Sequence, residues 1–151
     1  MFTQYLHLIR ELGKSFGVQD LTPDEDGACA LEVDEQLLLL RFNEKTEEAL
    51  LVCHLDYMPD EPDSVLYRRL LDHNGSPDGL EYSLVLDPDA RSIQLLRSVN
   101  VRAQDGASFL ALLEHTGREA TKWAEDIGAY LDSLENQSPA PDPAAGSQES
   151  P

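Results

Sequence analysis

Positively charged residues are scarce in this chain of 151 residues, which has 11 Lys and Arg against 29 Asp and Glu and a formal net charge of −18 at pH 7. Such a chain repels nucleic-acid phosphates and anionic membrane surfaces, so we expect neither as a partner. A DNA mimic is an alternative, but the acids are spread along the whole sequence and form no single row. Acidity that maintains solubility is the favoured interpretation.

Cysteine is also rare, and Cys29 and Cys53 belong to no CxxC motif or Cys/His cluster. Both fall in predicted strands, so we expect two buried thiols without chemistry. The sequence has no internal repeat and no glycine-rich phosphate loop, and its four histidines fall on separate predicted elements. We therefore expect no cofactor and no metal.

Long hydrophobic runs are missing as well. The first 16 residues are apolar at helical spacing, but His7, Arg10, Glu11 and Lys14 interrupt them. This segment is therefore predicted to be neither a signal peptide nor a membrane span, and we expect the protein to stay inside the cell.

The apolar pattern that is present predicts three helices and five strands. Apolar residues at steps of three and four predict helices over residues 3–17, 64–74 and 105–134. Alternating or continuous apolar runs predict strands over residues 28–33, 36–42, 48–56, 80–86 and 91–99. The order α-β-β-β-α-β-β-α and the short links predict an α+β domain over residues 1–135, whose five-stranded antiparallel sheet is covered by helices on one face. Residues 136–151 are rich in Pro, Ala and Ser and are predicted to be a disordered tail.

The predicted strands carry more apolar residues than one covered face can take, because alternate side chains point to opposite faces. The surplus residues are Leu37, Leu39, Leu50, Val52, Val85 and Leu96. A sheet covered on both faces or a dimer interface could absorb them, and so could a groove for a partner. Burying four such side chains contributes about 8 kcal/mol. Ordering an unstructured peptide costs about 1–2 kcal/mol per residue, so a disordered partner needs several patches, and a two-fold dimer doubles them.

Five segments carry a resemblance to a known family: FTQYLHLIRELGKSFG, LLLLRF, EEALLVCHLD, LEYSLVLDPDARSIQLLRS and DGASFLALLEHTGREATKWAEDIGAYLDSL. With the low mass, the pI of about 4.3 and the element order, they make residues 1–135 similar to the class I type III secretion chaperones, the Tir chaperone (CesT-like) family. The tail after Glu135 is longer than this family requires, and the pair Arg68-Arg69 in the second helix is a further departure.

The resemblance implies a non-enzymatic homodimer in the bacterial cytoplasm. Its partner would be the N-terminal chaperone-binding segment of a secreted effector, held extended and secretion-competent without ATP, and the secretion ATPase is a further candidate partner. The implied dimer interface comprises Val65, Leu66, Leu70, Leu71, Tyr82 and Leu84. The implied effector-binding residues are Phe2, Leu6 and Ile9 of the first helix, together with the surplus sheet residues.

Two other functions fit parts of the sequence. A dimeric adaptor or regulatory protein similar to the YbjN family would have the same architecture but would bind a folded partner. A small hydrolase could use His54 with Asp56, two positions apart on one predicted strand, but no Ser or Cys nucleophile in a recognisable elbow accompanies them. The acids of the last helix are interpreted as its solvated face, with a surface for a basic export component as the alternative.

Overall fold

The computed structural model describes residues 2–33 and 35–137 and confirms the predicted order of helices and strands. The elements are α1 (Phe2–Ser15), β1 (Ala28–Val33), β2 (Gln36–Asn43), β3 (Glu48–Tyr57), α2 (Ser64–Asn74), η1 (Pro77–Leu80), β4 (Ser83–Asp87), β5 (Ser92–Asn100), η2 (Val101–Ala103) and α3 (Gly106–Gln137). The two short 3-10 helices were not predicted. The prediction that a strand begins at Leu80 is wrong, because Pro77 starts η1 and its fixed φ suits a helical turn.

All strand pairs are antiparallel, and the sheet order is β1-β2-β3-β5-β4. The two hairpins β1-β2 and β4-β5 therefore lie at the two ends of the sheet, while β3 joins them by pairing with β5. As a result β1 and β4 are the edge strands, and in the described part of the chain their outer backbone groups have no neighbouring strand.

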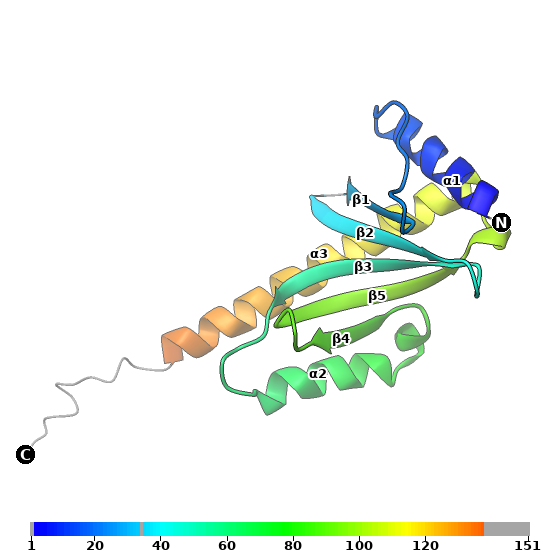
Figure 1. The fold of residues 1–151 in the computed structure, drawn as a ribbon. Helices are drawn as coiled ribbons and strands as arrows, with labels where there is room; N and C mark the ends of the chain where they lie inside the picture. Colours follow the sequence, from blue (N-terminus) through cyan, green and yellow to red (C-terminus); the bar gives the residue numbers. More distant parts are fainter. Residues whose placement is uncertain (1, 34, 138–151) are drawn as a thin grey trace, which may run out of the picture.

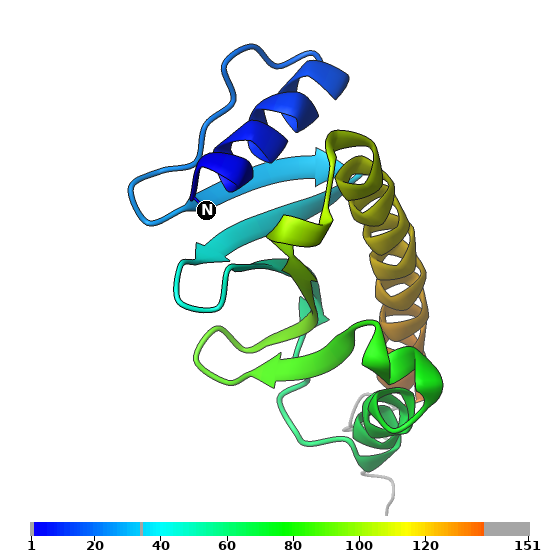
Figure 2. The same cartoon turned by 90° about the vertical axis from the view of Figure 1, so that its right-hand side faces the viewer.

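The helices cover one face of this sheet, as predicted. Figure 2 shows α3 running along that face, with α1 at the β1 end and α2 beside β4. In Figure 1 the sheet lies in front of α3, so its other face is turned towards the viewer. The core between sheet and helices contains Leu8, Leu12, Leu38, Leu40, Leu51, Leu95, Phe109 and Leu113, each at most 1% exposed. Cys29 and Cys53 are buried thiols there, as predicted, and burial raises the pKa of Cys53 to about 12.

The helix α1 is fixed to the sheet through Tyr5. Its ring stacks on Phe42 of β2 with 4.7 Å between ring centroids, and its hydroxyl donates a 2.8 Å hydrogen bond to the carbonyl of Gly27. Gly27 has φ of +79°, which favours glycine, and a Cβ there would lie 3.3 Å from the Phe42 side chain. The turn before β1 can therefore pass close to α1 and β2.

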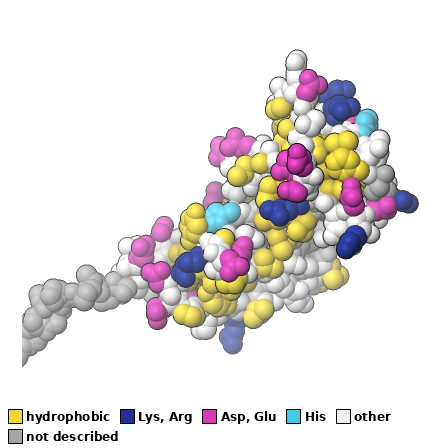
Figure 3. All heavy atoms as spheres, in the orientation of Figure 1, with side chains coloured by type: hydrophobic (Ala, Val, Ile, Leu, Met, Phe, Trp, Pro, Cys, Tyr) yellow, Lys and Arg dark blue, Asp and Glu magenta, His cyan; other side chains and the backbone are white. Residues whose placement is uncertain are grey.

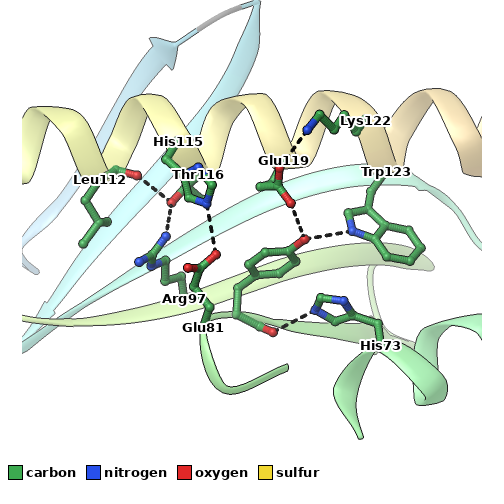
Figure 4. Close-up of polar contacts among 10 residues, drawn as sticks. His73, Glu81, Arg97, Leu112, His115, Thr116, Glu119, Lys122 and Trp123 are labelled. Atoms are coloured by element: carbon green, nitrogen blue, oxygen red, sulfur yellow. Dashed lines mark hydrogen bonds and ion pairs between the residues drawn. The ribbon is translucent and has the colours of Figure 1, made fainter. Parts of the chain in front are cut away.

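A network of polar side chains ties α3 to the β4 side of the sheet (Figure 4). The Tyr82 hydroxyl donates to Glu119 at 2.9 Å and accepts from the Trp123 indole N–H at 3.0 Å. Burial raises the pKa of Tyr82 to about 12. The hydrogen bond from Trp123 acts against this increase, and the Glu119 carboxylate adds to it. Partial burial alone would raise the pKa of Glu119, but hydrogen bonds from Tyr82 and Lys122 hold it below its ordinary value. Trp123 is partly buried and also packs against the core.

The long helix α3 continues two residues beyond the predicted domain boundary at residue 135 and ends at Gln137. The rest of the predicted tail, residues 138–151, lies outside the described residues. None of the described helices is long and apolar enough to cross a membrane.

Candidate partner-binding surface

The face of the sheet on which none of the described helices lies is called the open face below. It presents apolar side chains from β2, β3, β4 and β5: Leu37, Leu39, Leu50, Val52, Val85 and Leu96. Figure 3 shows this face, where hydrophobic side chains lie between acidic and basic ones. All six are the residues that the sequence predicted as surplus to the core. Leu37 is 65% exposed, and the other five are half-buried.

The register of the strands brings three of these side chains into one row. Leu39 of β2 is paired with Val52 of β3, which is paired in turn with Leu96 of β5. Directly paired residues on one face of a sheet have their side chains in contact, so the row forms an apolar band across three strands. Arg41 and Leu50 form the next pair along β2 and β3. A charged guanidinium therefore borders the band.

Two hollows adjoin the open face, and Leu50 lines both. One, of about 820 Å³, lies between α1 and the β2-β3 turn, with Phe2, Arg41 and Phe42 in its wall. The other, of about 350 Å³, lies beside β4 and is lined by Val85 and Leu96, among others. Both hollows can receive side chains of a partner that crosses the band.

The outer edge of β1 adjoins the open face. Both backbone groups of Ala28 point outwards, because its N–H donates to the Asp24 carboxylate and its carbonyl accepts from the Asp24 N–H. Outward groups recur at every second residue of an antiparallel strand, so those of Ala30 and Glu32 also point to the free edge. Within residues 2–33 and 35–137 no strand pairs with this edge. Sequence patterns do not show which strand ends a sheet, so this feature was not predicted.

The predicted effector-binding residues of α1 divide into two groups. Phe2 is 37% exposed at the larger hollow, and Leu6 is half-buried. Ile9 is 0% exposed, so its placement in a surface patch is corrected: it points into the core with Leu8 and Leu12.

The predicted dimer residues divide in the same way. Val65 and Leu71 of α2 are 55% and 68% exposed. Leu66, Leu70, Tyr82 and Leu84 are buried within the protomer, at most 4% exposed, and so offer little surface to a second copy. Helical periodicity identified the apolar residues of α2 but not which of them face the sheet.

The hydrogen bonds described for His54 and Asp56, the pair that a hydrolase could have used, go to other residues. The strand register shifts between these two residues, and the Asp56 carboxylate accepts from the Tyr57 N–H. His54 Nδ1 lies 2.6 Å from the hydroxyl of Ser92, which is only 3% exposed and is inaccessible to a substrate. The described residues contain no group of three metal-binding side chains.

Comparison with known proteins identifies the class. The model of the Tir chaperone protein (CesT) family matches residues 7–124. A chain of the ExsC–ExsE complex superposes with a TM-score of 0.71 at 21% identity, over 82% of this chain and 92% of that one. The type III secretion chaperone SycH of Yersinia pestis, solved with a fragment of YscM2, gives 0.61 at 20% identity, over 79% and 98%. The ExoT–SpcS complex of Pseudomonas aeruginosa gives 0.58 at 22% identity, over 81% and 98%. No curated protein sequence matches the chain.

The fold is therefore that of the class I type III secretion chaperones. Because the family model matches most of the sequence, the chain belongs to the Tir chaperone protein (CesT) family.

Proposed function

We propose that this protein is a type III secretion chaperone that holds the N-terminal segment of a cognate effector in extended form in the bacterial cytoplasm. The proposal rests on the apolar band Leu39–Val52–Leu96, which lies on the sheet face left uncovered by the helices of residues 2–33 and 35–137. The solved neighbours, one of which is the type III secretion chaperone SycH in complex with a fragment of YscM2, support the same function.

The geometry of the open face fits an extended segment. The band crosses three strands, and a strand added to the free edge at Ala30 and Glu32 would lie next to it. Backbone hydrogen bonds at such an edge provide affinity without sequence specificity, whereas side-chain pockets select the sequence. An unfolded segment of the effector could meet both requirements, and binding would keep its apolar residues away from water.

The size of the open face favours a dimer. Full burial of one Leu or Val contributes about 2 kcal/mol, and the six residues of the open face are mostly half-buried already. Ordering a peptide costs about 1–2 kcal/mol per residue, so one open face holds only a short segment. We propose a homodimer through the exposed side chains of α2, Val65 and Leu71, which would supply two open faces to one effector. The secretion ATPase is proposed as a later partner that receives the loaded chaperone.

Co-expression tests the proposal. The chain is produced with candidate effectors encoded nearby, and a true cargo is expected to become soluble and to co-purify in a fixed ratio. Limited proteolysis of the complex then reveals the state of the cargo. A chaperone leaves the bound segment non-globular, so it is cut where it is not shielded; a bound partner resistant throughout would instead indicate an adaptor for folded proteins.

Two leucines of similar exposure provide matched variants. Leu37, 65% exposed on the open face, and Leu71, 68% exposed on α2, are each replaced by Asp. Leu37→Asp is expected to weaken cargo binding and to leave the mass in light scattering unchanged. Leu71→Asp is expected to shift that mass towards the protomer. If neither variant affects cargo solubility or mass, the assignment of these surfaces is wrong.

A further inference from the structure

The edge of β4 differs from that of β1 because side chains from the end of α2 occupy it. The Asn74 carboxamide donates to the carbonyl of Leu84 at 2.8 Å and accepts from the Leu84 N–H at 2.8 Å. His73 Nε2 lies 3.1 Å from the carbonyl of Tyr82, the preceding outward residue. A carboxamide has an N–H donor and a carbonyl acceptor, as a peptide group has. Asn74 therefore forms the two hydrogen bonds with the backbone of Leu84 that a neighbouring strand would form.

The close approach of η1 fixes Asn74 in this position. Gly79 of η1 lies so close to the backbone of Asn74 that there is no room for a Cβ. A glycine is therefore required where the chain folds back over the end of α2, and the Asn74 carboxamide is held against Leu84, near the start of β4.

Edge strands with unpaired backbone groups pair readily with other chains. Tyr82, Leu84 and Leu86 are the residues of the β4 edge whose backbone groups point outwards, given the alternation set by Leu84. His73 contacts the carbonyl of Tyr82 and Asn74 bonds to both groups of Leu84, but no described hydrogen bond joins either side chain to Leu86. A second copy of the chain would need the groups of Leu84 to form a continuous ladder.

We propose that Asn74 closes the β4 edge against pairing with the β4 edge of a second copy of this chain. Self-association through β4 by backbone hydrogen bonds is thereby prevented, and strand addition is confined to the other end of the sheet. This role concerns the protein without cargo and does not depend on the proposed chaperone function.

The test compares Asn74→Ala with Ser76→Ala in the full chain. Asn74→Ala removes both hydrogen bonds to the backbone of Leu84, whereas Ser76→Ala removes only the bond from the Ser76 hydroxyl to the carbonyl of His73 at 2.6 Å. Circular dichroism and the fluorescence of Trp123 report whether each variant folds. Asn74→Ser, whose hydroxyl is too short to reach both groups of Leu84, is the second variant if Asn74→Ala fails to fold.

Two readouts decide the outcome. In Asn74→Ala the amide of Leu84 is expected to exchange with solvent roughly tenfold faster or more at low protein concentration, because it loses its acceptor. Sedimentation velocity is expected to show species larger than those of the unaltered protein, increasing with concentration. Ser76→Ala is expected to match the unaltered protein in both measurements.

A proline at Leu86 identifies the surface through which the larger species form. Proline lacks the outward N–H that edge pairing uses and is tolerated at edge strands, so Asn74→Ala combined with Leu86→Pro is expected to lose the larger species. Leu86→Pro alone is the control. The proposal is overturned if Asn74→Ala forms no larger species, if Leu84 stays protected in it, or if those species persist in the double variant.

Discussion

Replacing Val52 by Asp tests the role of the open face. Val52 lies in the middle of the apolar band, paired with Leu39 on one side and Leu96 on the other. Burial of a valine under a bound segment contributes about 1.5 kcal/mol, and an unpaired polar group in the same place costs about 1–3 kcal/mol. The variant should therefore lose about 3 kcal/mol of binding free energy, which corresponds to roughly a 100-fold higher Kd.

Folding should be affected much less than binding, because Val52 is half-buried in the free protein and a carboxylate there reaches water. The lower strand propensity of Asp costs up to about 1 kcal/mol. Fluorescence anisotropy with the labelled N-terminal segment of a co-purified effector measures Kd, and urea unfolding followed by Trp123 measures stability. Val52→Thr keeps the shape of the side chain and should have a smaller effect on Kd. A folded Val52→Asp variant that binds within about twofold of the unaltered protein would refute the reasoning.

Other predictions concern α3 and its contacts. A Cβ at Gly117 would lie 3.1 Å from the Val33 carbonyl oxygen, whereas one at Gly128 would meet only an Asp56 carboxylate oxygen at 3.6 Å. Gly117→Ala should therefore destabilise the protein by about 1–2 kcal/mol in urea unfolding, and Gly128→Ala should stabilise it by up to about 1 kcal/mol; equal effects would contradict this packing. The folded pKa of Glu119 lies below its ordinary value of 4.5, so its contribution to stability is present above that pH and is lost as the pH falls through the folded pKa. Glu119→Gln should show a smaller loss of stability than the unaltered protein as the pH falls from 7 to below the folded pKa of Glu119, and an unchanged pH profile would contradict the network around Tyr82.

Local patterns predicted the elements well because each depends on neighbours in the sequence. The steps of three and four in α1 and α3 and the alternation in β2 and β3 set both the type of element and the residues that share a face. The excess of apolar residues in β2 and β3 thus predicts that Leu37, Leu39, Leu50 and Val52 lie outside the core. Periodicity alone did not separate Ile9 from Phe2 on α1, because both belong to the same apolar stripe.

Features that depend on distant parts of the chain were not predictable in this way. Asn74 is the last residue of the helix predicted over residues 64–74, but its hydrogen bonds to Leu84 join residues ten positions apart through the turn at η1. The register shift after His54 likewise arises in the pairing of β3 with β5. The sheet order, which leaves β1 at an edge, follows from packing between hairpins and not from the sequence of either hairpin.

Methyl NMR of the complex tests the central claim most directly. The chaperone is labelled at its Leu and Val methyl groups and bound to an unlabelled effector segment. The account predicts contacts between the segment and the methyl groups of Leu39, Val52 and Leu96, together with slower exchange of the Ala30 and Glu32 amides. Contacts confined to the helical side of the molecule, with the methyl groups of the open face unchanged, would contradict it.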